Sequence, residues 1–274
     1  MYLDLIVWPF LAALVISGIH TYLGWHVVTR GVIFVDLALA QVAALGTAVG
    51  LLIGLDPTSV YTYVLAVGFT LIGAALFAGI RTLPDRIPQE AIIGITYVVS
   101  AALMIVLFSR SAEGAEEINH LLVGSILFVT PLVVGKMFVL YTVIGLFHWR
   151  YRSRFITTSR GGQGKIPPGF NVKLWDFLFY VTFGIVVTFS VRIAGVLLVF
   201  SYLIIPTVAA LYFQKRPLTV LIFGWLFSLA ASILGMIFSL LLDIPTGAAI
   251  VVTFGLLLMV NGGLFSFLNR KTVT

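Results

Sequence analysis

The sequence of 274 residues has no cysteine and little charge. Without cysteine the chain can form no disulfide, no thiolate metal site and no thiol nucleophile. Only 9% of the residues are Asp, Glu, Lys or Arg, whereas an average soluble domain has about 25%. The motifs HExxH and GxSxG are also missing, so an intramembrane hydrolase is poorly supported. The run GGQGK (161–165) lacks the spacing of a phosphate loop, and we therefore expect no nucleotide site and no bound cofactor in this chain.

Apolar residues take the place of charge. They make up 61% of the chain and occur in repeated runs of about 20 residues, the length that crosses a bilayer as a helix. The sequence predicts an all-α, polytopic transmembrane helix bundle in which residues 1–274 form a single transmembrane domain. The net charge of +6 does not indicate nucleic acid, because the basic residues lie in the connections between apolar runs. We expect a multi-pass protein of the plasma or inner membrane, surrounded by lipid.

Nine apolar segments are candidate spans, and eight is the alternative number. They cover roughly residues 5–27, 33–54, 59–80, 89–109, 131–149, 174–190, 194–213, 218–242 and 247–268.

The charged residues support nine spans with the amino terminus outside and the carboxyl terminus in the cytoplasm. This topology places 13 of the 16 Lys and Arg residues on the cytoplasmic side: Arg30, Arg81, Arg86, Arg150, Arg152, Arg154, Arg160, Lys165, Lys173, Lys215, Arg216, Arg270 and Lys271. The opposite side receives Asp4, Asp56, Glu113, Glu116, Glu117 and Asp243. The distribution satisfies the positive-inside rule at every connection.

Two connections have unusual composition. Residues 150–173 are basic and rich in Gly and Pro, which predicts a flexible cytoplasmic loop within the transmembrane domain. The outer loop at 111–120 is acidic, and the apolar stretch at 121–130 is too short to span. We expect a re-entrant or interfacial helix there, because irregular backbone at membrane depth needs protein or water around it.

Asp36 and Gln41 are the polar side chains of the second span that most need an explanation. An ionisable group at the centre of a spanning helix costs about 2.5–3.5 kcal/mol on insertion scales, and such a group usually faces protein or water. Asp36 is six residues from Arg30, so a backbone hydrogen bond or a pair with Arg30 is as good an explanation as a functional role. Gln41 is about 140° round the helix from Asp36. It is either a helix-to-helix hydrogen-bonding group or an oxygen that lines a pore.

Other polar residues of the spans have structural explanations. His20 and His26 are six residues apart, a poor helical spacing for one metal ion. Lys136 can snorkel to the interface, and Asp176 is expected to cap the start of its helix. Arg192 is expected at a short outer turn, and Asn261 between helices. The echoed segments IPTVA (205–209) and IPTGA (244–248) indicate either a broken helix or a proline near a helix end, and we favour the helix end.

Several patches, in order, resemble the membrane permease subunits of ABC transporters for zinc, manganese and iron, the ABC-3 family. Residues 30–46 read RGVIFVDLALAQVAALG, similar to the family's basic turn followed by a helix with an acid and a His. EAIIGITYVVS (90–100) and LVGSILFV (122–129) resemble two further family segments. RIAGVLLVFSYLIIPTVAALY (192–212) is the strongest match, and DIPTGAAIV (243–251) matches a late Pro-Thr-Gly segment. The ordered set covers roughly residues 10–265.

The sequence departs from the family in the second span. The resemblance implies a substrate path through this helix, but Leu37 stands where the family has its acid and Gln41 where it has His. Asp36 is one residue early. Asp36, Leu37 and Gln41 are therefore the predicted path residues, and Asp36 and Gln41 the predicted metal ligands. Oxygen ligands suit a harder ion than zinc, which prefers nitrogen and sulfur.

The resemblance also implies partners. It predicts a permease homodimer, two cytoplasmic ATPase subunits that use the ATP, and an extracytoplasmic substrate-binding protein; this chain itself would not be an enzyme. The family's ATPase-contacting helix maps to residues 206–217. The predicted coupling residues there are Pro206, Thr207, Ala210, Gln214, Lys215 and Arg216.

Three functions follow as hypotheses. The first is import of a divalent metal ion (zinc, manganese or iron) by alternating access driven by the partner ATPases. The second keeps the ABC architecture but carries a chelate or another non-metal solute. The third is a secondary transporter or channel that acts alone, and transport without ATP in vesicles that hold only this protein would distinguish it.

Overall fold

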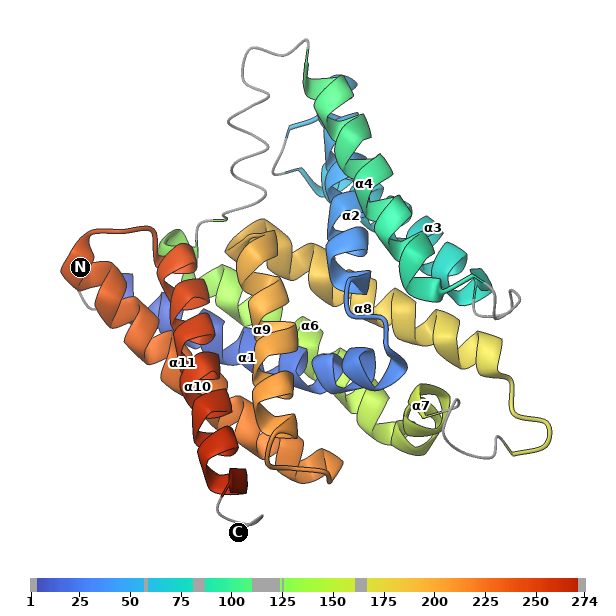
Figure 1. Ribbon diagram of the computed structural model, residues 1–274. Helices are drawn as coiled ribbons and strands as arrows, with labels where there is room; N and C mark the ends of the chain where they lie inside the picture. The colour runs from blue at the N-terminus through green and yellow to red at the C-terminus, as the bar shows by residue number, and fades with distance from the viewer. Residues whose placement is uncertain are drawn as a thin grey trace. The chain divides into compact units, whose positions relative to one another are not determined.

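The structure, a computed structural model, describes residues 4–56, 59–80, 87–109, 124, 126–160 and 167–270 (Figure 1). The described chain is helical and contains no strand, which confirms the predicted fold class. Its elements are α1 (Asp4–Arg30), α2 (Val35–Leu52), α3 (Val60–Ile80), α4 (Gln89–Phe108), η1 (Ile126–Phe128), α6 (Pro131–Arg150), α7 (Arg152–Ser159), α8 (Val172–Ala194), α9 (Val196–Leu211), α10 (Pro217–Leu242) and α11 (Thr246–Arg270).

Helices occupy all nine predicted span positions. Eight of them are long and apolar enough to cross a membrane: α1, α2, α3, α4, α6, α8, α10 and α11. The remaining helix, α9, has 16 residues. At 1.5 Å per residue it is about 24 Å long, less than the hydrocarbon thickness of about 30 Å. Eight candidate spans therefore support the predicted multi-pass membrane location.

The helices group into two compact units. Unit 1 comprises Met1–Val28, Val123–Tyr141 and Ile193–Thr274, and unit 2 comprises Thr29–Leu122 and Thr142–Arg192. Helices α1, α6 and α8 each contribute residues to both units.

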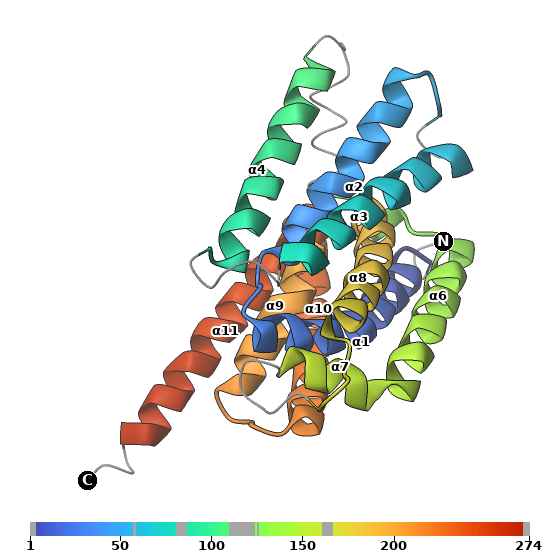
Figure 2. The same cartoon turned by 90° about the vertical axis from the view of Figure 1, so that its right-hand side faces the viewer.

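In unit 2, α2 packs along both α3 and α4, and Figure 2 shows the three helices together. A Cβ placed on Gly46 would lie 2.9 Å from the Ala66 Cα, so the glycine permits close contact with α3. On the other side, Ala44 and Ala48 pack against Met104 and Phe108 of α4. The small residues of α2 thus place it between two neighbours, and most of its side chains are buried.

In unit 1, α9 packs against α10 and α11. Asn261 of α11 donates a hydrogen bond from Nδ2 to the Ala209 carbonyl at 3.1 Å, which confirms its expected place between helices. A Cβ on Gly24 of α1 would lie only 1.9 Å from the Leu203 carbonyl oxygen of α9. The two backbones therefore approach as closely as glycine permits.

The two echoed proline segments have different structures. Pro206 lies inside α9, contrary to our preference for a helix end, whereas Pro245 directly precedes α11. Because proline has no N–H, it leaves the carbonyl of Tyr202, four residues earlier, without its helical donor. Thr207 donates from Oγ1 to the Leu203 carbonyl at 3.3 Å and remains buried, so the helix continues through the proline.

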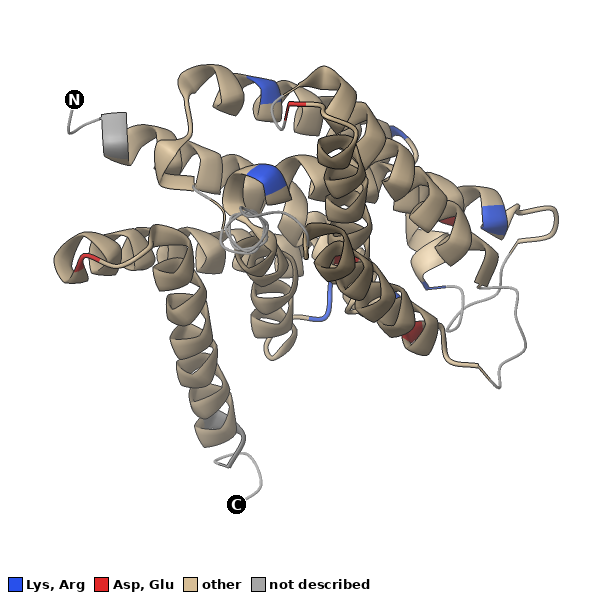
Figure 3. Ribbon diagram, turned by 90° about the horizontal axis from the view of Figure 1, so that it is seen from above, with Lys and Arg blue, Asp and Glu red and all other residues tan. Residues whose placement is uncertain are grey.

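The unusual connections are partly described. The predicted loop at 150–173 begins with the helix α7, whose Phe155 is buried and holds it to unit 2. At 126–128 the chain forms a short 3₁₀ helix, and residues 121–123 and 125 of the stretch expected to be re-entrant or interfacial lie outside the described residues. The acidic loop at 111–120 lies outside the described residues. Figure 3 shows how few charged positions interrupt the otherwise neutral helices.

Candidate functional site

Asp36 is the second residue of α2 and is 2% exposed. Its Oδ1 accepts a hydrogen bond from the Leu37 N–H at 2.7 Å. The carboxylate thus lies in the first turn of the helix, where free N–H groups and the helix dipole favour negative charge. This bond matches the backbone alternative that the sequence left open for Asp36.

Glu90 brings a second carboxylate to the same helix end. It is the second residue of α4, and its Oε1 accepts from the N–H of Phe34, the N-cap residue of α2, at 3.0 Å. Its other oxygen, Oε2, is buried and has no hydrogen-bond partner within the described chain. Two carboxylates from different helices therefore hold the first turn of α2.

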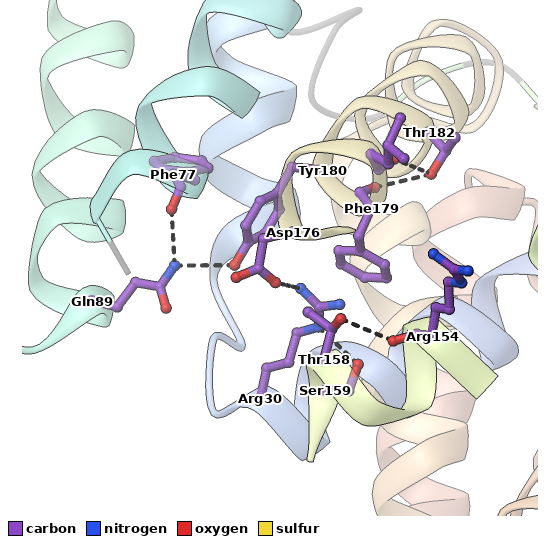
Figure 4. Close-up of polar contacts among 11 residues, drawn as sticks. Arg30, Phe77, Gln89, Arg154, Thr158, Ser159, Asp176, Phe179, Tyr180 and Thr182 are labelled. Carbon is purple, nitrogen blue, oxygen red and sulfur yellow. Dashed lines mark hydrogen bonds and ion pairs between the residues drawn. The ribbon is translucent and has the colours of Figure 1, made fainter. Parts of the chain in front are cut away.

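Gln89 fixes the start of α4 and thereby positions Glu90. Its Nε2 donates to the Phe77 carbonyl of α3 at 3.2 Å and to the Tyr180 hydroxyl of α8 at 3.0 Å (Figure 4). Sequence reasoning quoted Glu90 as part of a family segment but did not list it as a site residue. An acid two residues after Pro88, at the start of a span, was the available signal.

Gln41 is the third polar side chain of this region. It is 3% exposed, and its Oε1 has no hydrogen-bond partner among the described residues. An unsatisfied buried amide oxygen loses about 1–3 kcal/mol of solvation. Leu37, the other predicted path residue, is half-buried one turn earlier on α2. The role of Gln41 and Leu37 in a substrate path stays a prediction.

The donor atoms of this region are all oxygens. Asp36 and Glu90 supply carboxylates, and Gln41 supplies an amide carbonyl. In the described part of the chain no three His, Cys, Asp or Glu side chains come close enough to hold a metal ion. Oxygen donors suit Mg²⁺, Ca²⁺ and Mn²⁺ rather than zinc.

Arg30 binds Asp176 rather than Asp36. Its Nη1 lies 2.6 Å from the Asp176 Oδ1, and its Nε donates to the Ser159 Oγ at 2.9 Å (Figure 4). The guanidinium also lies 3.8 Å from the centre of the Phe179 ring. The Arg30–Asp36 pair considered from the sequence is therefore wrong.

The expectation that Asp176 caps α8 is also wrong. Asp176 lies one turn inside α8, and Asn171 accepts from the Leu174 N–H at 3.0 Å at the start of that helix. Asp176 is instead fully buried as the partner of Arg30. Arg192 likewise lies in the last turn of α8 rather than in a turn between spans, with its guanidinium 5.6 Å from the Tyr63 ring centre.

His20 and His26 remain structural residues. The His20 Nδ1 bonds with the Ile16 carbonyl at 2.9 Å in its own helix. The His26 ring lies against Tyr22 and Trp25, with centroid distances of 4.7 and 4.8 Å. Both are completely buried in α1.

The predicted coupling segment divides into a buried and an exposed part. Pro206, Thr207 and Ala210 are buried within α9, whereas Lys215 and Arg216 are exposed before α10 begins at Pro217. Gln214 is half-buried between them. The exposed surface of the connection also includes Leu211, Tyr212 and Phe213, which sequence reasoning did not name.

Eight candidate spans and a buried polar helix start define a multi-pass membrane protein with polar groups inside its helical units. The profile of the ABC 3 transport family matches residues 2–263, and the chain belongs to this family.

The chain is also similar in sequence and in fold to individual membrane transport proteins. The manganese import system permease protein ScaB of Streptococcus gordonii is 24% identical over 255 residues, covering 92% of this chain and 88% of the relative. The high-affinity zinc uptake system membrane protein ZnuB of Haemophilus influenzae is 24% identical over 256 residues, covering 92% and 94%. The solved structure of PsaBC from Streptococcus pneumoniae, in complex with Fab, superposes with a TM-score of 0.77 at 22% identity, covering 94% of this chain and 90% of the other. The fold is thus that of the matched chain in the PsaBC structure.

Proposed function

We propose that this chain is the permease subunit of an ABC transporter that imports a divalent metal ion by alternating access, with α2 lining the ion's path. The family and the names of the relatives support a transport role. The observation that carries the path is Gln41 of α2, whose buried carbonyl oxygen has no partner in the described chain. Asp36 lies in the first turn of the same helix.

We propose manganese as the preferred ion. Asp36, Glu90 and Gln41 offer only oxygen donors, which match the preference of Mn²⁺ for carboxylate and carbonyl ligands. Zinc would lose the imidazole that the family pattern supplies at the position of Gln41. Glu90 joins the two predicted ligands because its carboxylate binds the same helix end as Asp36.

The proposed partners are a second permease chain, two cytoplasmic ATPase subunits and an extracytoplasmic substrate-binding protein. ATP hydrolysis belongs to the ATPase subunits, because this chain has no nucleotide motif. Lys215 and Arg216, exposed just before α10, are the proposed contact with the ATPase. We expect this contact at the cytoplasmic face of the plasma membrane. Pro206, Thr207 and Ala210 would support that contact from within α9.

The deciding experiment is manganese uptake by the complex reconstituted with its ATPase. Asp36→Ala and Gln41→Ala should each lower the ATP-dependent initial rate at least tenfold while the complex still assembles, because each removes an oxygen donor from the path. Asn261→Ala, which removes a buried amide that bonds the Ala209 carbonyl in unit 1, is the matched amide control, and its effect should appear in thermal stability first. Normal uptake by the Asp36→Ala/Gln41→Ala double variant would remove α2 from the path.

The same preparation distinguishes the alternatives. Uptake without ATP by vesicles that hold only this chain would establish a secondary transporter instead. ATP-dependent uptake of a metal chelate, with no uptake of the free ion, would establish the second hypothesis.

Gln41→His tests the choice of ion. The substitution adds a nitrogen donor, so the ratio of zinc to manganese uptake should rise at least tenfold in competition assays. Gln41→Asn, which keeps the amide oxygen, is the control and should leave the ratio within twofold. An unchanged ratio in Gln41→His would show that Gln41 does not contact the ion.

A further inference from the structure

The end of α6 and the start of α7, both in unit 2, carry a basic cluster that the transport function does not use. Arg150, Arg152 and Arg154 occur within five residues, directly after Trp149. All three arginines are exposed, and none forms an ion pair with a carboxylate of the described chain. Their guanidinium N–H groups are therefore available to donate to a ligand.

The last turns of α6 have one buried and one exposed face. Ile144 and His148 are buried. The opposite face carries Val143, Leu146 and Trp149, which are 60%, 58% and 65% exposed. Successive members of this set are three residues apart, a spacing that places neighbours on one side of a helix. An apolar strip on a membrane-spanning helix thus ends in a tryptophan and then in arginines.

The helix α7 holds its arginines on a rigid support. Phe155 is fully buried and stacks on His148 with the ring centres 4.0 Å apart. His148 in turn bonds through Nε2 to the Thr182 hydroxyl of α8 at 2.8 Å. The backbone that carries Arg152 and Arg154 is therefore fixed to the body of unit 2.

Aromatic rings orient the guanidinium groups. Arg150 lies over Tyr151 at 5.3 Å and Arg152 over Trp149 at 5.8 Å, measured from Cζ to the ring centre. Stacking restricts a guanidinium before any ligand arrives, so less conformational entropy is lost when it forms hydrogen bonds. Planar guanidinium groups of this kind match the oxygens of a phosphate.

We propose that this surface, formed by Val143, Leu146, Trp149, Arg150 and Arg152, is a binding site for an anionic phospholipid of the inner leaflet. An acyl chain would lie along Val143 and Leu146, the Trp149 ring would lie at the level of the headgroups, and Arg150 and Arg152 would bind the phosphate. Tryptophan at the interface followed by basic residues is the arrangement that such lipids favour. The site rests on the predicted cytoplasmic location of Arg150, and it is independent of which solute is transported.

Native mass spectrometry of the full chain, delipidated in detergent, tests the site. Dioleoyl phosphatidylglycerol should bind at least tenfold more tightly than dioleoyl phosphatidylcholine, and added salt should weaken that binding. Arg150→Gln/Arg152→Gln should lower phosphatidylglycerol affinity at least tenfold. The control Lys136→Gln/Lys173→Gln also removes two exposed positive charges and should change it less than twofold. Arg152→Gln alone, with an intermediate loss, serves if the double variant does not fold.

Three results would overturn the proposal. Equal affinity for the two lipids would show that charge is not recognised. Equal losses in the arginine variant and the lysine control would show that only net charge matters, which is the outcome if the arginines serve topology alone. Glycerol phosphate binding as tightly as phosphatidylglycerol would show a site for soluble phosphate, without the acyl contacts to Val143 and Leu146.

Discussion

The two units satisfy their buried polar groups in different ways. Unit 2 uses an ion pair, that of Arg30 and Asp176, and both buried Asp side chains of the described chain, Asp36 and Asp176, belong to it. Unit 1 uses neutral contacts, such as the hydrogen bond of 2.6 Å between the Tyr202 and Ser232 hydroxyls and that of Asn261 with the Ala209 carbonyl. The unit that contains the proposed ion path is thus the one that already holds charge away from water.

This difference should be visible in how each unit responds to substitution. A buried charge that loses its partner is costly in a low-dielectric environment, whereas a hydroxyl that loses one bond can often use another. Unit 2 should therefore have a few positions of very large effect. Unit 1 should distribute its stability over many small contacts and over the close approaches of its glycines.

The largest effect is expected at Asp176. Asp176→Ala leaves the Arg30 guanidinium buried without its carboxylate, at a cost of about 3–5 kcal/mol in stability. The thermal midpoint in detergent and the yield of monodisperse protein should both fall sharply. Arg30→Gln/Asp176→Asn removes both charges and should recover much of the loss. A double variant as unstable as Asp176→Ala alone would show that Arg30 is not held by this pair.

A steric effect in unit 1 comes next. Gly24→Ala places a methyl carbon only 1.9 Å from the Leu203 carbonyl oxygen. Because this distance is far shorter than a van der Waals contact, α1 and α9 must separate. We expect a loss of about 1–3 kcal/mol, the usual cost of overpacking. Gly18→Ala, on the same helix, meets no atom within 4 Å and should be neutral or slightly stabilising because alanine favours helix. Equal effects of the two substitutions in thermal unfolding would contradict the close approach.

The helices were predictable from sequence because their signal is simple. Apolar runs of spanning length located the helices that occupy the nine predicted span positions. The partners of buried side chains were not predictable in the same way. Arg30 is 146 positions from Asp176, and only the fold decides that it binds there rather than to Asp36, six residues away. Local spacing favoured the wrong partner because contacts across the bundle outweigh proximity in sequence.

The candidate site was predicted in part. Asp36 and Gln41 attracted attention because polar groups are rare in the second span. Glu90 was overlooked because it stands at a helix start, where an acid normally needs no further explanation. Its bond to the Phe34 N–H joins two elements 56 positions apart, and no periodic pattern reports such a contact. The helix α7 was missed for a related reason: its basic, polar sequence resembles a loop, and the buried Phe155 that anchors it is a single residue.

The smallest expected loss of stability is at Tyr202. Its size tests whether the neutral polar contacts of unit 1 each contribute little. Ser232 donates from Oγ to the Ser228 carbonyl at 2.7 Å, so the Tyr202 hydroxyl is the donor in the bond between them. Tyr202→Phe removes that donor and leaves Ser232 bonded, which should cost only about 0.6 kcal/mol. Ser232→Ala instead leaves the buried Tyr202 hydroxyl without its acceptor and should cost more. Chemical unfolding in mixed micelles measures both. A loss in Tyr202→Phe as large as that in Asp176→Ala would mean that unit 1, like unit 2, depends on single polar contacts.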